Sequence, residues 1–330
     1  NGGITLNAAI TTDGVVGIDG PVTLATGAVS VTTVDDNITF EGTINGGQSL
    51  TLSSGSGTID LQGDIGTANS GTIASLTINN TNGAAGTINL PNIGTASAKG
   101  VSGATAVGNT STGTLILSGS TYNTTGTQQY TSTSGENIDL TKGSTTTFTT
   151  LNNNITFGTG TVEMADGSNL VIDTNTGGGA IDLTGGVVGT SSENITLTAG
   201  TGTVAIGAVG TGTEIADVSI TTSGNTTLSG DFTGGSLTNS GPAIVSDNIN
   251  LNTTGAINFG STVDSSNGSQ TITFGSATDI TITGLIGGTN PFSTFTISDA
   301  GTFTYSGGGS ISGFSSGKFS RTGGFAIFNP

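Results

Sequence analysis

Residues 194–210 read NITLTAGTGTVAIGAVG, and this stretch contains the pattern that decides the fold. In Ile195-Thr196-Leu197 and again in Val204-Ala205-Ile206, two strand-forming residues flank a small one, and a glycine-containing step follows each triplet. Alternation with a period of two is typical of a strand that buries one face. Glycine allows a tight turn after such a strand, because it adopts positive φ without strain. The stretch therefore predicts short strands joined by corners.

The same unit recurs along the chain. Its triplet and the following apolar residue are found at Ile4-Thr5-Leu6 to Ile10, Ile38-Thr39-Phe40 to Ile44, Ile59-Asp60-Leu61 to Ile65, Ile88-Asn89-Leu90 to Ile93, Ile181-Asp182-Leu183 to Val187, Val204-Ala205-Ile206 to Val209, Ile257-Asn258-Phe259 to Val263, and Ile280-Thr281-Ile282 to Ile286. Where the spacing is clearest, from Ile249 to Ile272 and from Ile272 to Phe295, it is about 23 residues. A unit this short cannot bury its own apolar face, so copies must stack on one another.

We therefore predict an all-β protein, a parallel β-helix (β-solenoid) of roughly 13–14 coils with about 20–25 residues each. Coils stacked about 4.8 Å apart would form a rod on the order of 65 Å long. The ends of each triplet should point inward and the middle residue should face water. The predicted outward residues are Thr5, Thr39, Thr51, Asp60, Thr77, Asn89, Asp139, Thr156, Asp182, Thr196, Thr273 and Thr281.

Composition excludes several classes of protein. The 330 residues include 59 glycines, no cysteine and no histidine, and only four cationic residues, Lys99, Lys142, Lys318 and Arg321. A net charge of −17 without clustered Lys or Arg argues against a nucleic-acid partner. No run of about 18 apolar residues predicts a transmembrane helix, and β-branched residues and glycine disfavour helices altogether. Trypsin cuts after Lys and Arg, which are few here, and strands that are hydrogen-bonded from coil to coil should open rarely. We therefore also expect the protein to resist trypsin and heat.

The composition changes little before about residue 290, so we interpret residues 1–290 as one β-solenoid shaft. Residues 95–150 are the least regular, because Tyr122, Gln128-Gln129-Tyr130 and Thr145-Thr146-Thr147 interrupt the pattern; we interpret them as coils with loop insertions. Residues 291–330 are rich in aromatic side chains, and we predict there a terminal cap or an intersubunit docking strand.

Three phrases of the sequence resemble the repeats of filamentous-haemagglutinin-like exoproteins, the large adhesins that Gram-negative bacteria export by two-partner secretion. They are NITFEGTING at 37–46, QSLTLSSGSG at 48–57 and the stretch 194–210. The resemblance covers most of the chain. It implies a right-handed parallel β-helix, export to the bacterial surface, and a structural or adhesive role. It brings no catalytic residue with it.

Parallel β-helices also include polysaccharide-degrading enzymes, which need clustered carboxylates. The best groupings in the sequence are Asp35-Asp36-Glu41, Glu163-Asp166-Asp173 and Glu214-Asp217, and none has a basic residue nearby. Without histidine or cysteine there is no activating imidazole, no thiol nucleophile and no zinc site. We predict no catalytic, cofactor-binding or metal-binding residue, with only incidental Ca²⁺ at aspartates and carbonyl oxygens of the corners.

The ends of the sequence indicate self-association. The first strand, Ile4-Thr5-Leu6, begins almost at residue 1, and the absence of an initial methionine suggests a processed form or a piece of a longer protein. Because solenoids usually cover their ends, we predict docking of a second copy by strand addition. The predicted docking residues are Ile4, Leu6, Phe319, Phe325, Ile327 and Phe328. The alternative is a tail that folds onto its own last coil.

These observations predict a non-enzymatic extracellular or cell-surface protein, a rod that joins head-to-tail into a filament or forms an adhesin shaft. Its expected partners are copies of itself and host or surface glycans; nucleic acid and membrane insertion are not expected. One alternative is a carbohydrate-binding or polysaccharide-degrading β-helix protein. A second is an ice-binding solenoid that would use threonine runs at 145–150 and 271–283. A third, tandem immunoglobulin-like sandwiches, would need a much longer repeat.

Overall fold

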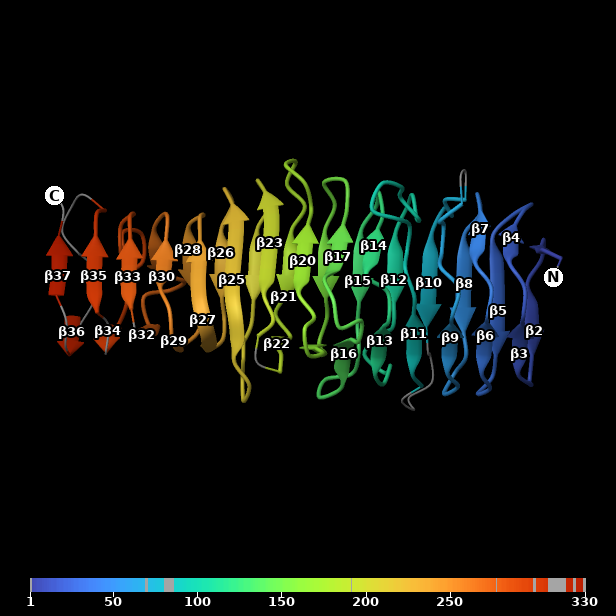
Figure 1. Ribbon diagram of the computed structural model, residues 1–330, viewed down its shortest axis with the longest axis horizontal. Coiled ribbons are helices and arrows are strands. Elements are labelled where there is room, and N and C mark those ends of the chain that lie inside the picture. Colours follow the sequence, from blue (N-terminus) through green and yellow to red (C-terminus); the bar gives the residue numbers. More distant parts are fainter. Residues whose placement is uncertain are drawn as a thin grey trace. The chain divides into compact units, whose positions relative to one another are not determined.

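The computed structural model describes residues 2–68, 71–79, 86–190, 192–276, 278–298, 301–307, 319–322 and 325–328. These residues form strands joined by turns and loops, with no helix among them. They belong to two compact units, Asn1–Thr174 and Asn175–Pro330. In each unit short parallel strands stack coil upon coil (Figure 1), so the predicted β-solenoid is confirmed.

Three faces make up each coil of unit 1, and every strand pairs in parallel with its counterpart in the next coil. The first face contains β1 (Ile4–Leu6), β4 (Val22–Leu24), β7 (Ile44–Gly46), β14 (Thr121–Asn123), β17 (Thr146–Thr149) and β20 (Leu170–Asp173), with bridges at Ile65 and Ile93 between β7 and β14. The second face contains β2 (Ile10–Thr12), β5 (Val29–Thr33), β8 (Leu50–Ser53), β10 (Leu76–Asn79), β12 (Thr105–Val107), β15 (Gln128–Tyr130) and β18 (Ile155–Phe157). The third face contains β3 (Val16–Ile18), β6 (Ile38–Phe40), β9 (Ile59–Leu61), β11 (Ile88–Leu90), β13 (Leu115–Leu117), β16 (Asn137–Leu140) and β19 (Thr161–Met164).

Unit 2 repeats this arrangement with longer strands. One ladder contains β21 (Ile181–Leu183), β24 (Val204–Ile206), β26 (Thr226–Leu228), β28 (Ala243–Val245) and β31 (Val263–Ser265). A second contains β23 (Ile195–Gly200), β25 (Ile215–Thr222), β27 (Phe232–Asn239), β29 (Ile249–Thr253), β32 (Thr271–Ser276), β34 (Thr294–Ser298) and β36 (Phe319–Thr322). Strand β27 also starts a branch that contains β30 (Ile257–Phe259), β33 (Asp279–Ile282), β35 (Thr302–Tyr305) and β37 (Phe325–Phe328). The short β22 (Val187–Val188) bridges to Val209.

The core consists of columns of apolar side chains that occupy the same position in successive coils. On the first face of unit 1 the column is Ile4, Val22, Ile44, Ile65, Ile93, Tyr122, Phe148 and Ile172. From Val22 onward every member is buried, whereas Ile4 is half-buried. The predicted outward residues are all half-buried or exposed, so the assignment of the two faces of each strand is confirmed.

The described residues form about 12 turns, close to the roughly 13–14 coils predicted. The difference comes from turns that are longer than the sequence spacing indicates. Asn92 and Thr121 are hydrogen-bonded across adjacent coils although they are 29 residues apart, and Asp64 and Asn92 are 28 residues apart. In unit 2, by contrast, Thr222 and Ser240 are only 18 residues apart. Strand length also differs between coils, from two residues in β22 to eight in β25, so strands and corner loops share the variation.

Four of the irregular residues between 95 and 150, namely Tyr122, Gln128, Tyr130 and Thr146, lie in the core, whereas Gln129 and Thr145 are exposed and Thr147 is half-buried. Tyr122 and Tyr130 are fully buried, and Tyr122 stacks on Phe148 with ring centroids 4.7 Å apart. The Tyr122 hydroxyl donates to the carbonyl oxygen of Leu90 at 3.0 Å. The buried Gln128 amide donates to the carbonyl oxygens of Tyr122 and Thr149, each at 2.9 Å. This stretch therefore keeps the coil and replaces small core residues by aromatic and hydrogen-bonded ones.

Some corner glycines are required by close backbone approach. A Cβ atom on Gly42 would lie 2.3 Å from the carbonyl carbon of Gly20, and one on Gly63 would lie 2.2 Å from that of Gly42. Neither Gly42 nor Gly63 has positive φ. Since real Cβ atoms do not approach backbone this closely, these three glycines form a column in which successive corners contact one another directly.

Thr146 allows a test of the core. Its hydroxyl is buried on β17 without a hydrogen-bond partner, and Leu170 occupies the same position in the next coil. We expect Thr146→Val to raise the free energy of unfolding by about 1 kcal/mol, because the substitution removes an unsatisfied buried hydroxyl. The outward neighbour Thr147 is the matched control, and Thr147→Val should change stability by less than about 0.5 kcal/mol. Urea denaturation of both variants checks this; equal shifts, or a less stable Thr146→Val protein, would contradict it.

Candidate functional site

The outward side chains of the third face of unit 1 form a row rich in carboxylates and amides. In parallel register from coil to coil, the row consists of Thr39, Asp60, Asn89, Ile116, Asp139 and Glu163. Neighbouring strands lie about 4.8 Å apart, so adjacent members of the row interact directly. Asp60 shows the favourable case: its carboxylate accepts from the Asn89 amide at 2.8 Å and from the Gln62 amide at 2.7 Å.

Asp139 and Glu163 show the unfavourable case. They are neighbours in register, and Asp139 Oδ1 is buried without a hydrogen-bond partner. Glu163 accepts a hydrogen bond from the Asn137 amide. Burial raises the pKa of Asp139, and the negative charge of Glu163 raises it further. With Leu140, Thr141 and Ala165, the pair lines a small cavity of about 160 Å³.

This pair predicts a pH-dependent stability. Because the folded-state pKa of Asp139 lies above its unfolded value, the folded protein binds the proton more tightly, and stability falls as pH rises through the folded-state pKa. At neutral pH Asp139→Asn should therefore stabilise the protein, by no more than about 1 kcal/mol because the pair is partly exposed. The gain should disappear below the unfolded pKa, where Asp139 is protonated in both states.

Asp60→Asn is the matched control, because it is the same substitution in the same row. It removes the charge from a carboxylate that accepts two hydrogen bonds, so it should lower stability at neutral pH. Urea denaturation of both variants at pH 3 and pH 7 measures the difference. An Asp139→Asn protein that is destabilised at pH 7 would show that the two carboxylates do not oppose each other.

The carboxylate groupings named from the sequence do not assemble into metal-binding clusters. Within the described ranges, no three acidic, histidine or cysteine side chains gather in a group that could hold a metal ion. Instead, individual carboxylates bind neighbouring coils. Asp35 accepts from the backbone amide and the hydroxyl of Ser56, which lowers the pKa of Asp35. Asp217 accepts from the Ser236 hydroxyl at 2.6 Å.

The predicted docking residues lie on strands at the ends of the ladders. Ile4 and Leu6 are half-buried on β1 and pair with Val22 and Leu24. Phe319 lies on β36, and β37 pairs in parallel with β35. The side chains of Phe319, Phe325, Ile327 and Phe328 lie outside the described part of the structure. Docking of a second copy stays a prediction.

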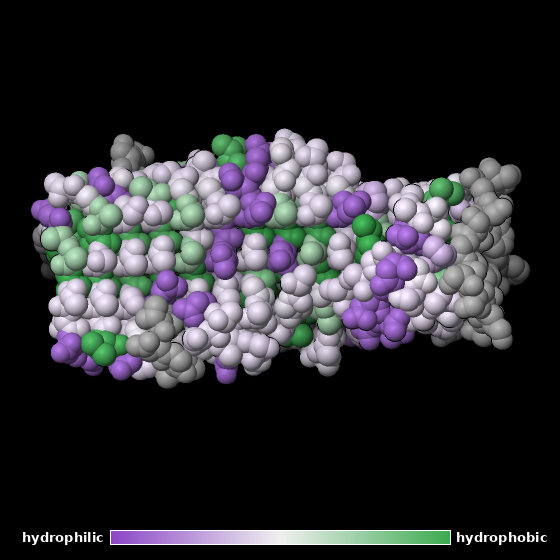
Figure 2. All heavy atoms as spheres, turned by 180° about the vertical axis from the view of Figure 1, so that it is seen from behind, coloured by the Kyte–Doolittle hydropathy of each residue, from purple (hydrophilic) through white to green (hydrophobic). Residues whose placement is uncertain are grey.

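The predicted threonine run 145–150 does not form a continuous outward array, and the use of either run for ice binding stays a prediction. In the run 145–150, Thr146 and Thr150 are buried, whereas Thr147 and Thr149 are half-buried. A longer outward row of small polar residues is found on unit 2 and consists of Thr196, Ser219, Thr238, Asn258, Thr281 and Thr304. Comparable rows of weakly hydrophilic side chains, with apolar atoms visible between them, run across the N-terminal coils at the left of Figure 2.

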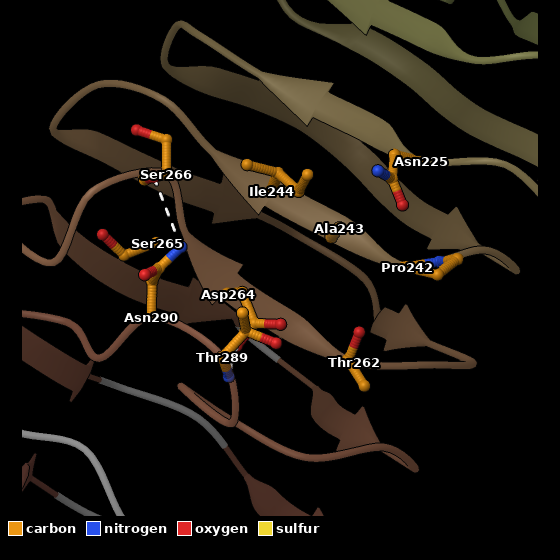
Figure 3. A pocket seen from close by; sticks show the side chains of 10 residues that line it. All are labelled: Asn225, Pro242, Ala243, Ile244, Thr262, Asp264, Ser265, Ser266, Thr289 and Asn290. Atoms are coloured by element: carbon orange, nitrogen blue, oxygen red, sulfur yellow. Dashed lines mark hydrogen bonds between the residues drawn. The ribbon is translucent and has the colours of Figure 1, made fainter.

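A groove lies on the surface of unit 2 (Figure 3). It has a volume of about 470 Å³ and is lined by Asn225, Pro242, Ala243, Ile244, Thr262, Asp264, Ser265, Ser266, Thr289 and Asn290. It lies over β28 and β31, the last two strands of a ladder whose outward row consists of Asp182, Ala205, Thr227, Ile244 and Asp264. Ile244 and Asp264 are neighbours in this row.

Hydrogen bonds to β31 and to the residue after it hold the segment that forms one wall of the groove. The backbone amide of Thr289 donates to Asp264 Oδ1 at 3.0 Å, and the Asn290 side chain donates to the carbonyl oxygen of Ser266 at 3.3 Å. Sequence reasoning missed this site. The available signal was Ile244, an apolar residue in the middle of the triplet Ala243-Ile244-Val245, where a small polar residue is expected.

Comparisons with known proteins give no relative: no family model matches the chain, and neither does any curated protein or solved structure. The resemblance to filamentous-haemagglutinin-like exoproteins therefore stays a hypothesis. Over the described residues, the structure contains no helix with the length and apolar character that a membrane span requires.

Proposed function

We propose that this chain is a non-enzymatic extracellular structural protein, whose β-solenoid serves as the shaft of a surface adhesin or filament. The observation that supports the proposal is the unbroken stacking within each unit. On the first face of unit 1, eight residues in successive coils occupy one inward column, and the backbone pairs from coil to coil beside it. Because these hydrogen bonds follow the stacking direction, the backbone itself resists extension.

The surface chemistry suits such a role. Outward positions hold small uncharged residues such as Thr77, Thr156 and Thr281, which favour strands and keep the faces hydrated. Scattered carboxylates give a net charge of −17, which opposes non-specific association. The export and surface location rest on the repeat resemblance, and glycans are the partners we propose for an adhesive role.

Head-to-tail self-association extends the proposal. Among the described strands, β1 pairs with β4 alone and β37 pairs with β35 alone. A strand with an open edge is a template for pairing with another chain. Since the edges are parallel and the contact joins different surfaces of two copies, repeated addition would produce an open filament.

Electron microscopy of the purified protein tests self-association. We expect filaments whose number and length increase with protein concentration. Leu6→Lys should reduce them strongly, because it places a charge on the half-buried side of β1. Thr5→Lys, on the exposed side of the same strand, is the matched control and should leave assembly nearly unchanged. Single particles at every concentration, or equal assembly by both variants, would refute head-to-tail joining.

Limited proteolysis tests the compactness of the ladder. Lys142 lies in an exposed corner loop, whereas Lys99 is half-buried. We expect native protein to resist trypsin at 37 °C, with any slow cleavage beginning at Lys142 and abolished by Lys142→Gln. Protein unfolded in urea before digestion is the control and should be cut at all cationic residues. Rapid digestion of native protein at Lys99 would show that the coils open easily.

A further inference from the structure

The groove on unit 2 has the dimensions of a small-molecule site. Its volume of about 470 Å³ falls within the range of about 300–1,000 Å³ that is typical of ligand pockets. It lies on the outer surface of paired strands β28 and β31, whose backbone positions the side chains rigidly. One wall is the segment that contains Thr289 and Asn290, which lies beside β31 and is hydrogen-bonded to Asp264 and Ser266 (Figure 3).

The floor of the groove is apolar. Ile244 is half-buried and points outward, between Thr227 on one side and Asp264 on the other. Ala243 precedes it on β28 with its side chain buried in the core, and Pro242 lies farther along the groove near Asn225 and Thr262 (Figure 3). An isoleucine in a row of otherwise small or polar residues leaves an isolated apolar surface at the bottom of a polar groove. Such a surface suits a ligand with one apolar face.

The walls carry hydrogen-bonding groups of both kinds. Asp264 supplies the carboxylate, and the amide of Thr289 restrains its Oδ1, so its orientation is set before a ligand binds. Asn225 and Thr262 supply a neutral amide and a hydroxyl on the side near Pro242. Groups that are already held lose little freedom on binding, which favours a specific polar contact.

The lining excludes other classes of ligand. Asp264 is the single charged residue among the ten lining residues, so an anion would be repelled. A single carboxylate also makes a poor calcium site, because affinity for calcium depends on the number of charged ligands. Seven of the ten lining residues are polar, which disfavours a lipid. A neutral sugar remains, because its ring combines an apolar C–H face with hydroxyl groups around the edge.

We propose that this groove binds a neutral saccharide, with Asp264 accepting hydrogen bonds from its hydroxyl groups and Ile244 contacting the C–H face of a ring. The site assigns the glycan contact to specific residues. It needs only the folded solenoid, so it holds whether or not the protein forms filaments.

A glycan array tests the proposal with the full chain. The array carries oligomers of glucose, galactose, mannose and N-acetylglucosamine, together with sialylated and sulfated glycans. We expect binding to one or more neutral oligomers, unchanged by EDTA. Absence of binding to every neutral oligomer, binding restricted to sialylated or sulfated glycans, or loss of binding with EDTA would each overturn the proposal.

Titration of the best soluble oligomer against variants locates the site. Asp264→Asn and Ile244→Ala should each weaken binding about tenfold or more, because a hydrogen bond to a charged acceptor and the buried apolar contact are lost. Asp182→Asn, in the same outward row beyond the groove, is the control for charge. Ile116→Ala, at an outward position of unit 1, is the control for side-chain size.

Both controls should bind as the unaltered protein does, and denaturation midpoints show that all four variants are folded. Undiminished binding by Asp264→Asn and Ile244→Ala would place the glycan elsewhere and refute the groove. Failure of this experiment would leave the shaft proposal intact, since imaging of filaments measures a separate property.

Discussion

The structure depends on one constraint: each residue pairs in parallel with the residue at the same position in the next coil. This register places side chains of one kind above one another, so a column that begins with Val22 continues with buried apolar residues to Ile172. It also brings like groups together on the outside. The same geometry that joins Asp60 to the Asn89 amide forces Asp139 against Glu163. Favourable and unfavourable contacts on the surface therefore have a common origin in the ladder.

Much of the fold could be predicted from local sequence, because a half-buried strand is visible in three residues. The triplet Ile59-Asp60-Leu61 is strand β9 with its ends buried and Asp60 outward, as predicted. Coil length was harder to predict, because the glycine and threonine residues of the loops do not show which residues of adjacent coils pair. Tyr122 and Gln128 looked like interruptions, since their burial depends on partners such as Phe148 and Thr149 in the following coil.

The groove could not be predicted for the same reason. Ile244 and Asp264 become neighbours only when the register between β28 and β31 is known, and Thr289 reaches Asp264 from a distance of 25 residues. No periodicity encodes that contact. The sequence does contain one local exception. Ile244 occupies an outward position at which small or polar residues are expected. In a repeat protein, binding sites are expected at such exceptions, because the residues at regular positions are needed for the stacking of the coils.

The unequal length of the turns has an evolutionary consequence. Hydrogen-bonded residues in adjacent coils can be 18 residues apart, as Thr222 and Ser240 are, or 29 residues apart, as Asn92 and Thr121 are, yet the strands keep their parallel pairing. Unequal recombination within the gene could therefore duplicate or delete whole coils, because the strands on either side of the new junction could still pair in parallel. Loops at the corners can diverge independently of this process. Such a protein can therefore change its number of coils and the sequence of its exposed loops independently during evolution.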